Sequence, residues 1–380
     1  MRSDAGDADQ APSSAVALGS SAGVLLLGPA RSAVSGVSTH LNQLFESTLS
    51  ARFRLSQFQV GSEGRAEGRG GALARLITSP FVLAAHLLRS QPRIVHINTS
   101  LEPKSYWRDL MYLTVAKLMR RKVVCQVHGG ALPTDFFPSN RALTALLRFV
   151  LSWPEVVVLL AHSEMVAYRE FAPRARLVRI SNAVQLDDVV LDAERYAPTR
   201  PLEIAYLGRL AADKGIFETI EAVRILRSRN IDVRLVIAGS GAALPEIRQA
   251  ITSAELGNRV DLLGAVSGAA KQRLWRQAQV FSFPTYHREG LPYALLEAMA
   301  NGAVPVTSPV GAIPDVMQDL VHGLFVPPRD PQSLAEALGR LATDRALLQR
   351  LARAARDRVV SHYSVARLAE EFSSLYRSLL

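Results

Sequence analysis

The sequence predicts an α/β protein: two Rossmann-like domains that face a central cleft, followed by a C-terminal helix. The length of 380 residues exceeds one ordinary domain and suits two. Short apolar runs alternate with longer segments of helical periodicity, which is typical of parallel sheets with crossover helices. A polar stretch over 181–201, ending in Ala-Pro-Thr-Arg-Pro, divides this alternation into two series.

The first series predicts a domain over 21–185, preceded by an Asp-, Ser- and Ala-rich tail (1–20) that we expect to be disordered. Its β-branched and apolar runs predict strands at Gly23–Gly28, Phe53–Val60, Ile94–Ile97, Val123–Val127, Val156–Leu160 and Leu177–Ile180. Helical periodicity predicts helices at Gly36–Ser50, Ala72–Arg89, Tyr106–Arg120, Arg141–Leu151 and Ser163–Phe171. The five glycines of Gly61–Gly71 predict a mobile surface loop.

After a linker over 186–200, the second series predicts a domain over 201–360. Its apolar runs predict strands at Leu202–Leu207, Val233–Ala238, Val260–Leu263, Val280–Phe283, Ala303–Thr307 and Leu324–Val326. Helices are predicted at Gly215–Arg229, Leu244–Ala254, Ser267–Ala278, Pro292–Asn301 and Ser333–Arg356. A terminal helical segment (361–380), with its periodic part at Val365–Leu380, has no strand after it.

The charge pattern narrows the range of partners. The chain carries a net charge of +10, but its basic residues are spread along the sequence, which argues against nucleic acid. Phosphorylated ligands and an anionic membrane surface remain. For a membrane we single out 120–122 (Arg-Arg-Lys), Arg141 and Arg148, which lie near the apolar stretch Ala142–Val150.

The sequence also bears on location. The N-terminus lacks the basic region and unbroken apolar core of a secretory signal, and no run reaches about 18 apolar residues. We therefore expect a cytoplasmic protein, peripheral at the inner face of the membrane if the basic surface is used. Cys125 is the single cysteine, which excludes an internal disulfide and a Cys-based metal site.

Residues 283–300 carry the most specific pattern of the chain. Glu289 and Glu297 stand eight positions apart, the first in a loop after a predicted strand and the second inside a predicted helix. Pro292 suits the first turn of that helix. Backbone amides at the helix N-terminus form a ready anion site; they belong to Gly290, Leu291 and Tyr293. A phosphate held there, with hydroxyl-bearing groups on both sides, matches the shape of a sugar nucleotide.

Two cations follow the first strand of the second series, in Gly208-Arg209 and Lys214-Gly215. Standing on either side of a tight turn, Arg209 and Lys214 can hold a diphosphate from two directions. We expect both side chains on an exposed turn, and a plain solvated turn is the alternative. The later turn Gly239-Ser-Gly241 lacks the full G-x-G-x-x-G pattern, so it does not support a nicotinamide site.

The first series contributes two further candidates. Gly36 lies where a loop enters a helix and permits close backbone approach to a ligand. His128 follows a strand, is freed by Gly129-Gly130, and is placed to donate a hydrogen bond or move a proton. An ordinary loop and a structural histidine are the alternatives. We expect His40 to pack along its helix and His96 to be structural.

Several catalytic signatures are missing from the sequence. No His/Asp/Glu set has metal-ligand spacing, and neither a G-x-S-x-G elbow nor a Walker loop occurs. Metal, hydrolase and phosphotransferase sites are therefore disfavoured.

These segments together resemble the retaining glycosyltransferases of family 4, which have the GT-B fold. The stretch Glu289–Glu297 resembles the E-x7-E signature, and 208–215 resembles the diphosphate clamp of that family. Ser-Asn-Ala-Val at 181–184 is similar to its interdomain Asn-Gly-Val, and Val127-His128-Gly129 to its His-Gly. The resemblance runs from about Val24 to Tyr363, with departures where Ser-Gly replaces Gly-Gly at 35–36 and Leu-Pro replaces Phe-Gly at 291–292.

The resemblance implies a role for each candidate. Arg209 and Lys214 would neutralise the leaving diphosphate in place of a metal ion. Glu297 would bind the ribose hydroxyls, and Glu289 the hydroxyls of the donor sugar. His128 would contact that sugar near the reacting centre, while Gly36 would let the first-domain loop meet the phosphates. No cofactor is implied, and the leaving phosphate would help to deprotonate the acceptor on one face.

The implied function is transfer of a sugar from a nucleotide-diphosphate sugar to a glycan or lipid-linked acceptor, in bacterial surface polysaccharide or glycolipid assembly. A nucleotide-sugar epimerase or hydrolase on the same fold is one alternative. It would need no acceptor groove, so product analysis separates the two. A non-catalytic sugar-nucleotide-binding protein is the other alternative.

Overall fold

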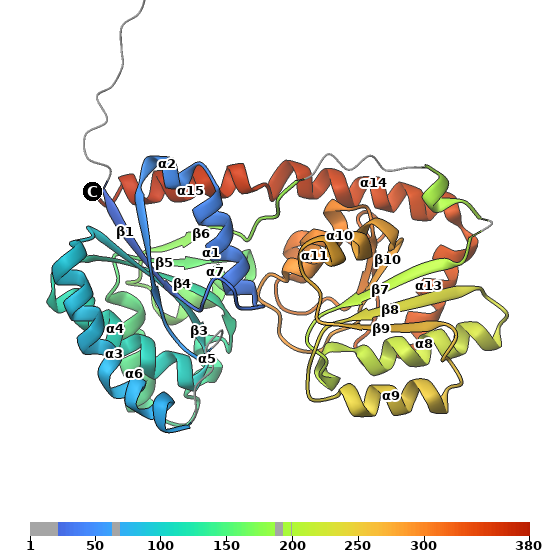
Figure 1. The fold of residues 1–380 in the computed structure, drawn as a ribbon, viewed down its shortest axis with the longest axis horizontal. Helices are drawn as coiled ribbons and strands as arrows, with labels where there is room; N and C mark the ends of the chain where they lie inside the picture. The colour runs from blue at the N-terminus through green and yellow to red at the C-terminus, as the bar shows by residue number, and fades with distance from the viewer. Residues whose placement is uncertain (1–21, 63–68, 187–192, 199) are drawn as a thin grey trace, which may run out of the picture.

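The computed structural model describes residues 22–380 except 63–68, 187–192 and 199. It consists of two α/β lobes that lie side by side, with two C-terminal helices running along one edge of both (Figure 1). Each lobe contains a six-stranded sheet, and all the strand pairings in both sheets are parallel. The predicted α/β class is confirmed.

The first sheet has the order β2-β1-β3-β4-β5-β6. Its strands are β1 (Gly23–Gly28), β2 (Arg54–Gln59), β3 (Ile94–Leu101), β4 (Lys122–Gly130), β5 (Val156–Leu159) and β6 (Leu177–Arg179). Its helices are α1 (Gly36–Glu46), α2 (Leu49–Arg52), α3 (Arg69–Ser90), α4 (Pro103–Leu118), α5 (Pro133–Phe136), α6 (Arg141–Ser152) and α7 (His162–Phe171). Because α3 begins at Arg69, the predicted loop 61–71 is too long at its C-terminal end; its part at 63–68 lies outside the described residues.

The apolar run of β1 is buried on both faces, as expected for a parallel strand covered by helices. Alternate side chains of a strand point to opposite faces. Leu25 and Leu27 belong to the core under α3 and α4, whereas Val24 and Leu26 belong to the core under α1, α2 and α15 (Val365–Arg377). The run therefore serves two cores at once.

The second sheet has the order β12-β11-β10-β7-β8-β9. Its strands are β7 (Leu202–Leu207), β8 (Val233–Ala238), β9 (Val260–Gly264), β10 (Val280–Phe283), β11 (Val304–Thr307) and β12 (Leu324–Phe325). Its helices are α8 (Ile216–Ser228), α9 (Leu244–Ser253), α10 (Gly268–Gln277), α11 (Tyr293–Ala300), α12 (Ile313–Val316), α13 (Pro331–Thr343) and α14 (Arg345–His362), with short 3-10 turns at η1 (Ala193–Tyr196) and η2 (Ala212–Lys214).

Both strand orders place a topological switch point where ligands bind in open α/β sheets. In the first lobe the chain leaves β1 for β2 on one side and returns to β3 on the other. In the second lobe it leaves β7 for β8 and later returns to β10 on the opposite side of β7. Gly36 begins the helix that follows β1, and the loops after β7 and β10 carry Arg209 and Glu289, so these candidates lie at the switch points.

Two predicted helices are divided in the structure. The expected helix Ser333–Arg356 breaks at Asp344, whose carboxylate accepts a hydrogen bond from the amide of Leu347 at 2.8 Å and caps α14. Asp is favoured at an N-cap because it satisfies an amide that has no partner inside the helix. The expected helix Gly36–Ser50 likewise divides between α1 and α2 at 47–48.

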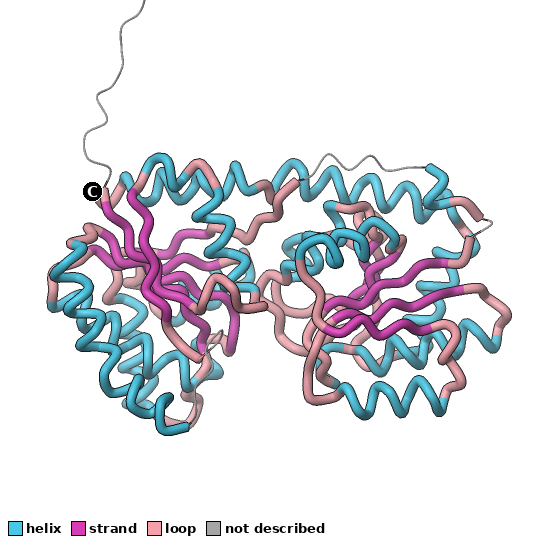
Figure 2. The backbone as a smooth tube through the Cα atoms, viewed as in Figure 1, coloured by secondary structure: helices cyan, strands magenta, loops and turns pink. Residues whose placement is uncertain are grey.

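The C-terminal helix α15 crosses back from the second lobe to the first (Figure 2). The crossing lies beside the connection at 181–184: the Val184 amide donates to the Tyr363 carbonyl at 2.8 Å, and Arg367 donates to the carbonyl of Ser181 at 2.8 Å. The two chain segments that join the lobes, one at 181–184 and one at 363–367, therefore lie in contact with each other. Within the described part of the chain, none of the helices has the length and apolar content to cross a bilayer.

Replacing Phe372 with alanine should lower the free energy of unfolding by about 3–5 kcal/mol, because its ring is fully buried between α15 and the first sheet. Urea denaturation measures the change. The matched control is Ser374→Ala, an exposed position on the same helix. A loss below about 1 kcal/mol for Phe372→Ala would show that α15 does not stabilise the first lobe.

Candidate active site

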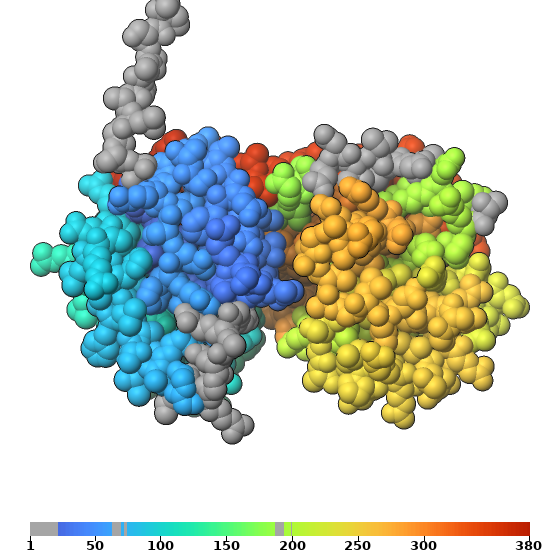
Figure 3. Space-filling view, in the orientation of Figure 1, coloured from blue at the N-terminus to red at the C-terminus, as the bar shows by residue number. Residues whose placement is uncertain are grey.

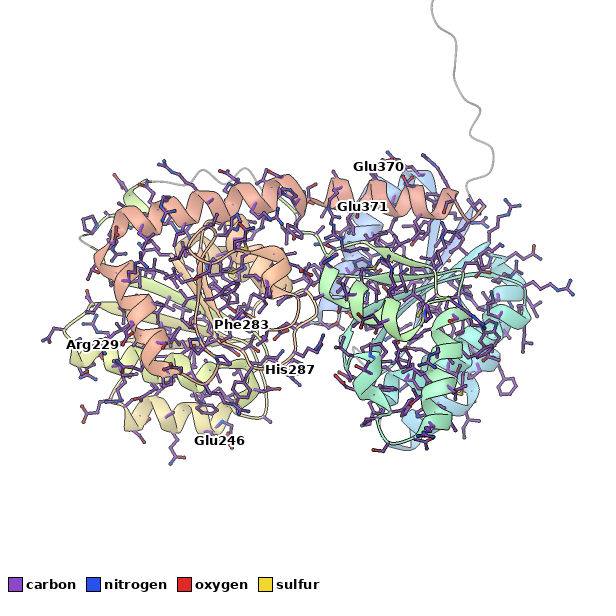
Figure 4. All side chains as sticks on the ribbon, turned by 180° about the vertical axis from the view of Figure 1, so that it is seen from behind. Arg229, Glu246, Phe283, His287, Glu370 and Glu371 are labelled. Atoms are coloured by element: carbon purple, nitrogen blue, oxygen red, sulfur yellow. The ribbon has the colours of Figure 1, made fainter. Side chains whose placement is uncertain are left out.

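Loops from the two lobes meet at the furrow that Figure 3 shows between them. A Cβ added to Gly290 would lie 3.3 Å from the Cα of Gly129, and one added to Gly36 would lie 3.5 Å from the ring of Tyr293. The predicted glycines of the first lobe thus face the predicted helix N-terminus of the second. Figure 4 shows His287, in the same loop as Glu289, near this junction.

A salt bridge between Lys214 and Glu289 forms the centre of the second-lobe side. The Nζ atom of Lys214 lies 2.6 Å from Oε1 of Glu289, and the two side chains are only 11% and 12% exposed. The Thr285 hydroxyl donates to the same oxygen at 3.2 Å. A lysine and a glutamate 75 residues apart are therefore held together by the loops after β7 and β10.

Glycines make this close approach of the two loops possible. Gly215 adopts a left-handed conformation (φ 75°), and a side chain there would collide with the Pro284 carbonyl of the β10 loop. A side chain at Gly239 would collide with the Gly208 carbonyl, so the turn after β8 presses against the start of the clamp. Residues 208–215 can pack against both neighbouring loops only because these positions lack Cβ atoms.

The expectation of an exposed turn holds for Arg209 but is wrong for Lys214. The Arg209 side chain is 59% exposed, whereas Lys214 is buried. The reason is the Glu289 carboxylate, which approaches from a distant loop and pairs with the ammonium group. Sequence spacing alone could not reveal this contact.

Asp213 links the clamp to the β10 loop and was missed from the sequence. Its Oδ2 lies 2.8 Å from Nδ1 of His287 and 3.8 Å from a guanidinium nitrogen of Arg209. Its carbonyl accepts hydrogen bonds from the amides of Tyr286 and His287 at 3.0 and 2.9 Å. The only sequence signal is its place inside the clamp motif, one residue before Lys214.

Glu297 is held by two side chains of α10. Lys271 Nζ lies 2.7 Å from one carboxylate oxygen, and the Trp275 indole donates to the other at 3.1 Å. Both partners were missed, although their four-residue spacing places them on one helix face. Glu297 is 14% exposed and therefore has a fixed orientation with limited contact to solvent.

The three predicted anion-binding amides lie at the start of α11, whose first turn contains no acidic residue. These amides belong to Gly290, Leu291 and Tyr293. Within the described part of the chain, none of the three amides donates a hydrogen bond to a protein acceptor. The Leu291 carbonyl accepts from the Asn182 amide at 2.8 Å, which ties this turn to the interdomain connection.

His128 lies on the first-lobe side, half-buried, with Nε2 2.8 Å from Oδ1 of Asn98. The Asn98 amide nitrogen donates to the Leu27 carbonyl at 3.0 Å, so its oxygen is the atom that faces His128. His128 therefore donates through Nε2 and keeps Nδ1 as an acceptor. Burial, with His40 and His96 nearby, holds the pKa of His128 well below its ordinary value.

His40 and His96 lie behind His128 in the interior, and both are fully buried. The rings of His40 and His128 are 4.9 Å apart, and His96 Nδ1 lies 2.6 Å from the Tyr376 hydroxyl on α15. The Tyr293 hydroxyl of the second lobe lies 3.4 Å from Nδ1 of His40. The three histidines thus lie between α15 and the side of the furrow that the first lobe forms.

The buried histidines should make stability fall in mild acid. Burial lowers the pKa of His40 to about 4 and that of His96 to about 3, from an ordinary value of 6.5. Between pH 6.5 and about 4 the unfolded chain binds protons that the folded chain does not. Unfolding free energy should therefore decrease as the pH falls, by up to about 1.4 kcal/mol per pH unit for each histidine.

Urea denaturation between pH 7 and pH 5 measures this slope. The variant His40→Gln should show a clearly smaller slope than the wild type. His162→Gln, at an exposed position, serves as the control. An unchanged slope in His40→Gln would contradict the assignment of the acid sensitivity to this cluster.

Residues 191–358 match the family model described as "Glycosyl transferases group 1". The chain is 27% identical over 265 residues to an alpha-D-kanosaminyltransferase from Streptomyces kanamyceticus, covering 70% of this chain and 64% of that protein. It is 33% identical over 175 residues to an amylovoran biosynthesis glycosyltransferase from Erwinia amylovora, covering 45% and 43%. The chain thus aligns with between about two fifths and two thirds of the length of these curated relatives.

Solved structures match nearly the whole fold. A sucrose-phosphate synthase from Thermosynechococcus elongatus superposes with a TM-score of 0.77 at 18% identity, covering 94% of this chain and 99% of that one. Anabaena HepE in complex with UDP-glucose gives 0.73 at 15% identity, covering 94% and 99%. These likenesses confirm the predicted GT-B fold. Together, the family match and the relatives support a glycosyltransferase built on that fold.

Proposed function

We propose that the protein is a retaining glycosyltransferase that moves a sugar from a nucleotide-diphosphate sugar to a glycan or lipid-linked acceptor. The observation that carries this proposal is the pairing of Lys214 with Glu289, directly before the amides at the start of α11, with Arg209 on the same turn as Lys214. A role in bacterial surface polysaccharide assembly is supported by relatives named for amylovoran and capsular polysaccharide biosynthesis.

The diphosphate of the donor would bind between Arg209, Lys214 and the α11 amides. The fork of Arg209 is exposed and can approach the phosphates, while Lys214 provides a fixed point charge. These groups stabilise the negative charge that grows on the diphosphate as the sugar leaves. Glu297, oriented by Lys271 and Trp275, would accept hydrogen bonds from the ribose hydroxyls.

Glu289 would bind hydroxyls of the donor sugar rather than attack it. Its carboxylate lies 2.6 Å from Lys214, on the side where the phosphates would bind. A nucleophile in a double displacement must stand on the face of the sugar opposite the leaving group. We therefore propose a reaction on one face, which retains the anomeric configuration, with the leaving phosphate accepting the proton of the acceptor hydroxyl.

His128 would act as an acceptor at the donor sugar. Because Nε2 is committed to Asn98 and the low pKa keeps the ring neutral, Nδ1 can accept a hydrogen bond from a sugar hydroxyl. The sequence predicts that His128 donates a hydrogen bond or moves a proton; with Nε2 donating to Asn98, we propose that Nδ1 is the atom that meets the sugar.

A panel of nucleotide sugars tests the proposal through thermal shift, release of free nucleotide, and product analysis. We expect one donor to stabilise the protein and to release nucleotide faster when an acceptor is present, with retained configuration in the product. Isomerisation of the donor, or release of free sugar that no acceptor accelerates, would favour an epimerase or hydrolase. Binding without turnover would favour a sugar-nucleotide-binding protein.

Turnover should survive an excess of EDTA. In the proposed site, Arg209, Lys214 and three backbone amides would contact the diphosphate, so its charge would be neutralised without a metal ion. Initial rates before and after chelation, with the donor found in the panel, provide the measurement. Loss of activity on chelation that Mn²⁺ or Mg²⁺ restores would contradict the assigned clamp.

A further inference from the structure

A groove of about 1410 Å³ lies on the first lobe between α3 and α4 and extends to the candidate active site. Its inner end includes Val37 of α1 and Asn98, the residue that bonds to His128. Small-molecule pockets usually enclose about 300–1,000 Å³. The groove therefore suits a longer ligand, one end of which reaches the reacting centre.

The outer half of the groove is apolar and open to solvent. On α3, Ile77 is 63% exposed and Phe81 is 74% exposed, and Trp107 of α4, 44% exposed, also lines the groove. Soluble proteins rarely leave such neighbouring large apolar side chains uncovered without a binding role. These side chains would be covered by a hydrocarbon chain.

The charged side chains of the groove slightly favour an anion. Among its described lining residues, Arg75, Lys104 and Arg108 are cationic and Glu102 is anionic. The guanidinium of Arg108 already binds the buried carboxylate of the neighbouring Asp109 at 2.6 Å, so these five side chains together carry an excess of one positive charge. The 16-residue helix α4 also begins there, at Pro103, and its N-terminal dipole attracts negative charge.

The basic face expected near α6 is a weaker candidate. The Arg148 guanidinium donates to the Phe171 carbonyl at 2.8 Å and stacks on the Phe171 ring, and Arg121 donates to the Leu87 carbonyl at 3.4 Å. These two side chains therefore hold the first lobe together. The groove, by contrast, joins open apolar surface to the candidate active site.

We propose that the groove between α3 and α4 binds a lipid acceptor that bears a phosphate, with its hydrocarbon chain along Ile77, Phe81 and Trp107. This inference rests on the proposed function, because the groove is the acceptor path only if the cleft transfers a sugar. The donor would be held by the second lobe, so an acceptor must reach it from the first. Asn98 joins the groove to His128 and sets where the acceptor head meets the donor.

Dodecyl phosphate, used below its micelle concentration, is the probe. Titration into the full-length protein should change tryptophan fluorescence saturably, and the signal should be lost in Trp107→Phe. Phe81→Ser should weaken binding about tenfold or more, because burying a phenylalanine ring contributes about 1.5–3 kcal/mol. Leu88→Ser, at a position 66% exposed on the same helix but outside the groove, should bind as the wild type does.

Several outcomes would overturn the inference. Equal binding by Phe81→Ser and wild type would remove the apolar site, as would a loss shared by Leu88→Ser. If dodecyl maltoside bound equally tightly, the groove would not recognise the phosphate group. If inorganic phosphate gave the same fluorescence change, the hydrocarbon chain would not contribute to binding and the ligand would not be a lipid. Binding only to anionic vesicles, with none to monomeric dodecyl phosphate, would indicate a bilayer surface instead.

The two proposals can fail separately. Saturable, Phe81-dependent binding of dodecyl phosphate in a protein that releases no nucleotide from any donor would refute the transferase and leave a lipid site. Nucleotide release without dodecyl phosphate binding would refute only the groove assignment.

Discussion

Replacing Lys214 with alanine should lower kcat/KM for sugar transfer by about 10²–10³-fold and should also destabilise the protein. The loss of activity is expected because Lys214 is the cation that would stabilise the leaving diphosphate. The loss of stability follows because Glu289, only 12% exposed, would remain without its partner at 2.6 Å. Removing one partner of a buried pair costs about 3–5 kcal/mol, and the slight exposure of both side chains places the expected loss near the lower value. Initial rates and urea denaturation measure the two effects.

Arg209→Ala is the matched control for this prediction. It should reduce kcat/KM by a similar factor, because the guanidinium would bind the same diphosphate. Its side chain is 59% exposed, and its ion pair with Asp213 is long, at 3.8 Å. Exposed ion pairs contribute little to stability, so the free energy of unfolding should change little. Wild-type activity in both variants would refute the clamp. Equal stability of both variants would refute the structural role of the Lys214–Glu289 pair.

Replacing Glu289 with glutamine should lower kcat by about 100-fold while changing the affinity for the donor much less. Glutamine has the same shape and can keep the hydrogen bond from Thr285, so the loop should stay folded. In the proposed role, the carboxylate charge would be needed most as positive charge develops on the sugar, and an interaction made mainly in the transition state appears in kcat. Steady-state kinetics and donor titration separate the two quantities.

Two results would contradict this role of Glu289. A glycosyl group trapped on Glu289 and found by mass spectrometry would make it a nucleophile. Undiminished turnover in Glu289→Gln would reduce the carboxylate to a partner that merely holds Lys214. The double variant Lys214→Ala/Glu289→Gln should be less unstable than Lys214→Ala alone, because it leaves no buried charge without a partner.

The alternation of apolar runs was sufficient to predict the two parallel sheets, and β1, β7, β8 and β10 have the predicted bounds. A strand that is covered by helices on both faces needs a continuous apolar run, and such a run can be recognised within a few consecutive residues of the sequence. Helix breaks were less predictable: Asp344 interrupts a continuous helical pattern through one capping bond. The crossing of α15 to the first lobe depends on tertiary packing of Phe372 and Tyr376, which periodicity does not report.

The candidate site was predictable where a local motif carries the chemistry and unpredictable where distant residues meet. The strand-end loops place Arg209 and Gly290 at one edge of the second sheet because parallel strands end at one edge of a sheet. Gly36 follows a strand of the first sheet, and its contact with Tyr293 depends on how the two lobes pack. The Lys214–Glu289 contact joins two loops that were each assigned to a ligand, so neither motif predicts the other as its partner. Asn98, which sets the tautomer of His128, belongs to a neighbouring strand and has no motif of its own.

A crystal structure with a nucleoside diphosphate bound tests the central claim most directly. We predict phosphate oxygens within hydrogen-bond distance of Arg209, Lys214 and the amides at the start of α11, with the ribose against Glu297. A nucleotide bound elsewhere would contradict the account, for example in the arginine-lined groove of about 1010 Å³ beside α10 that includes Arg200 and Arg273.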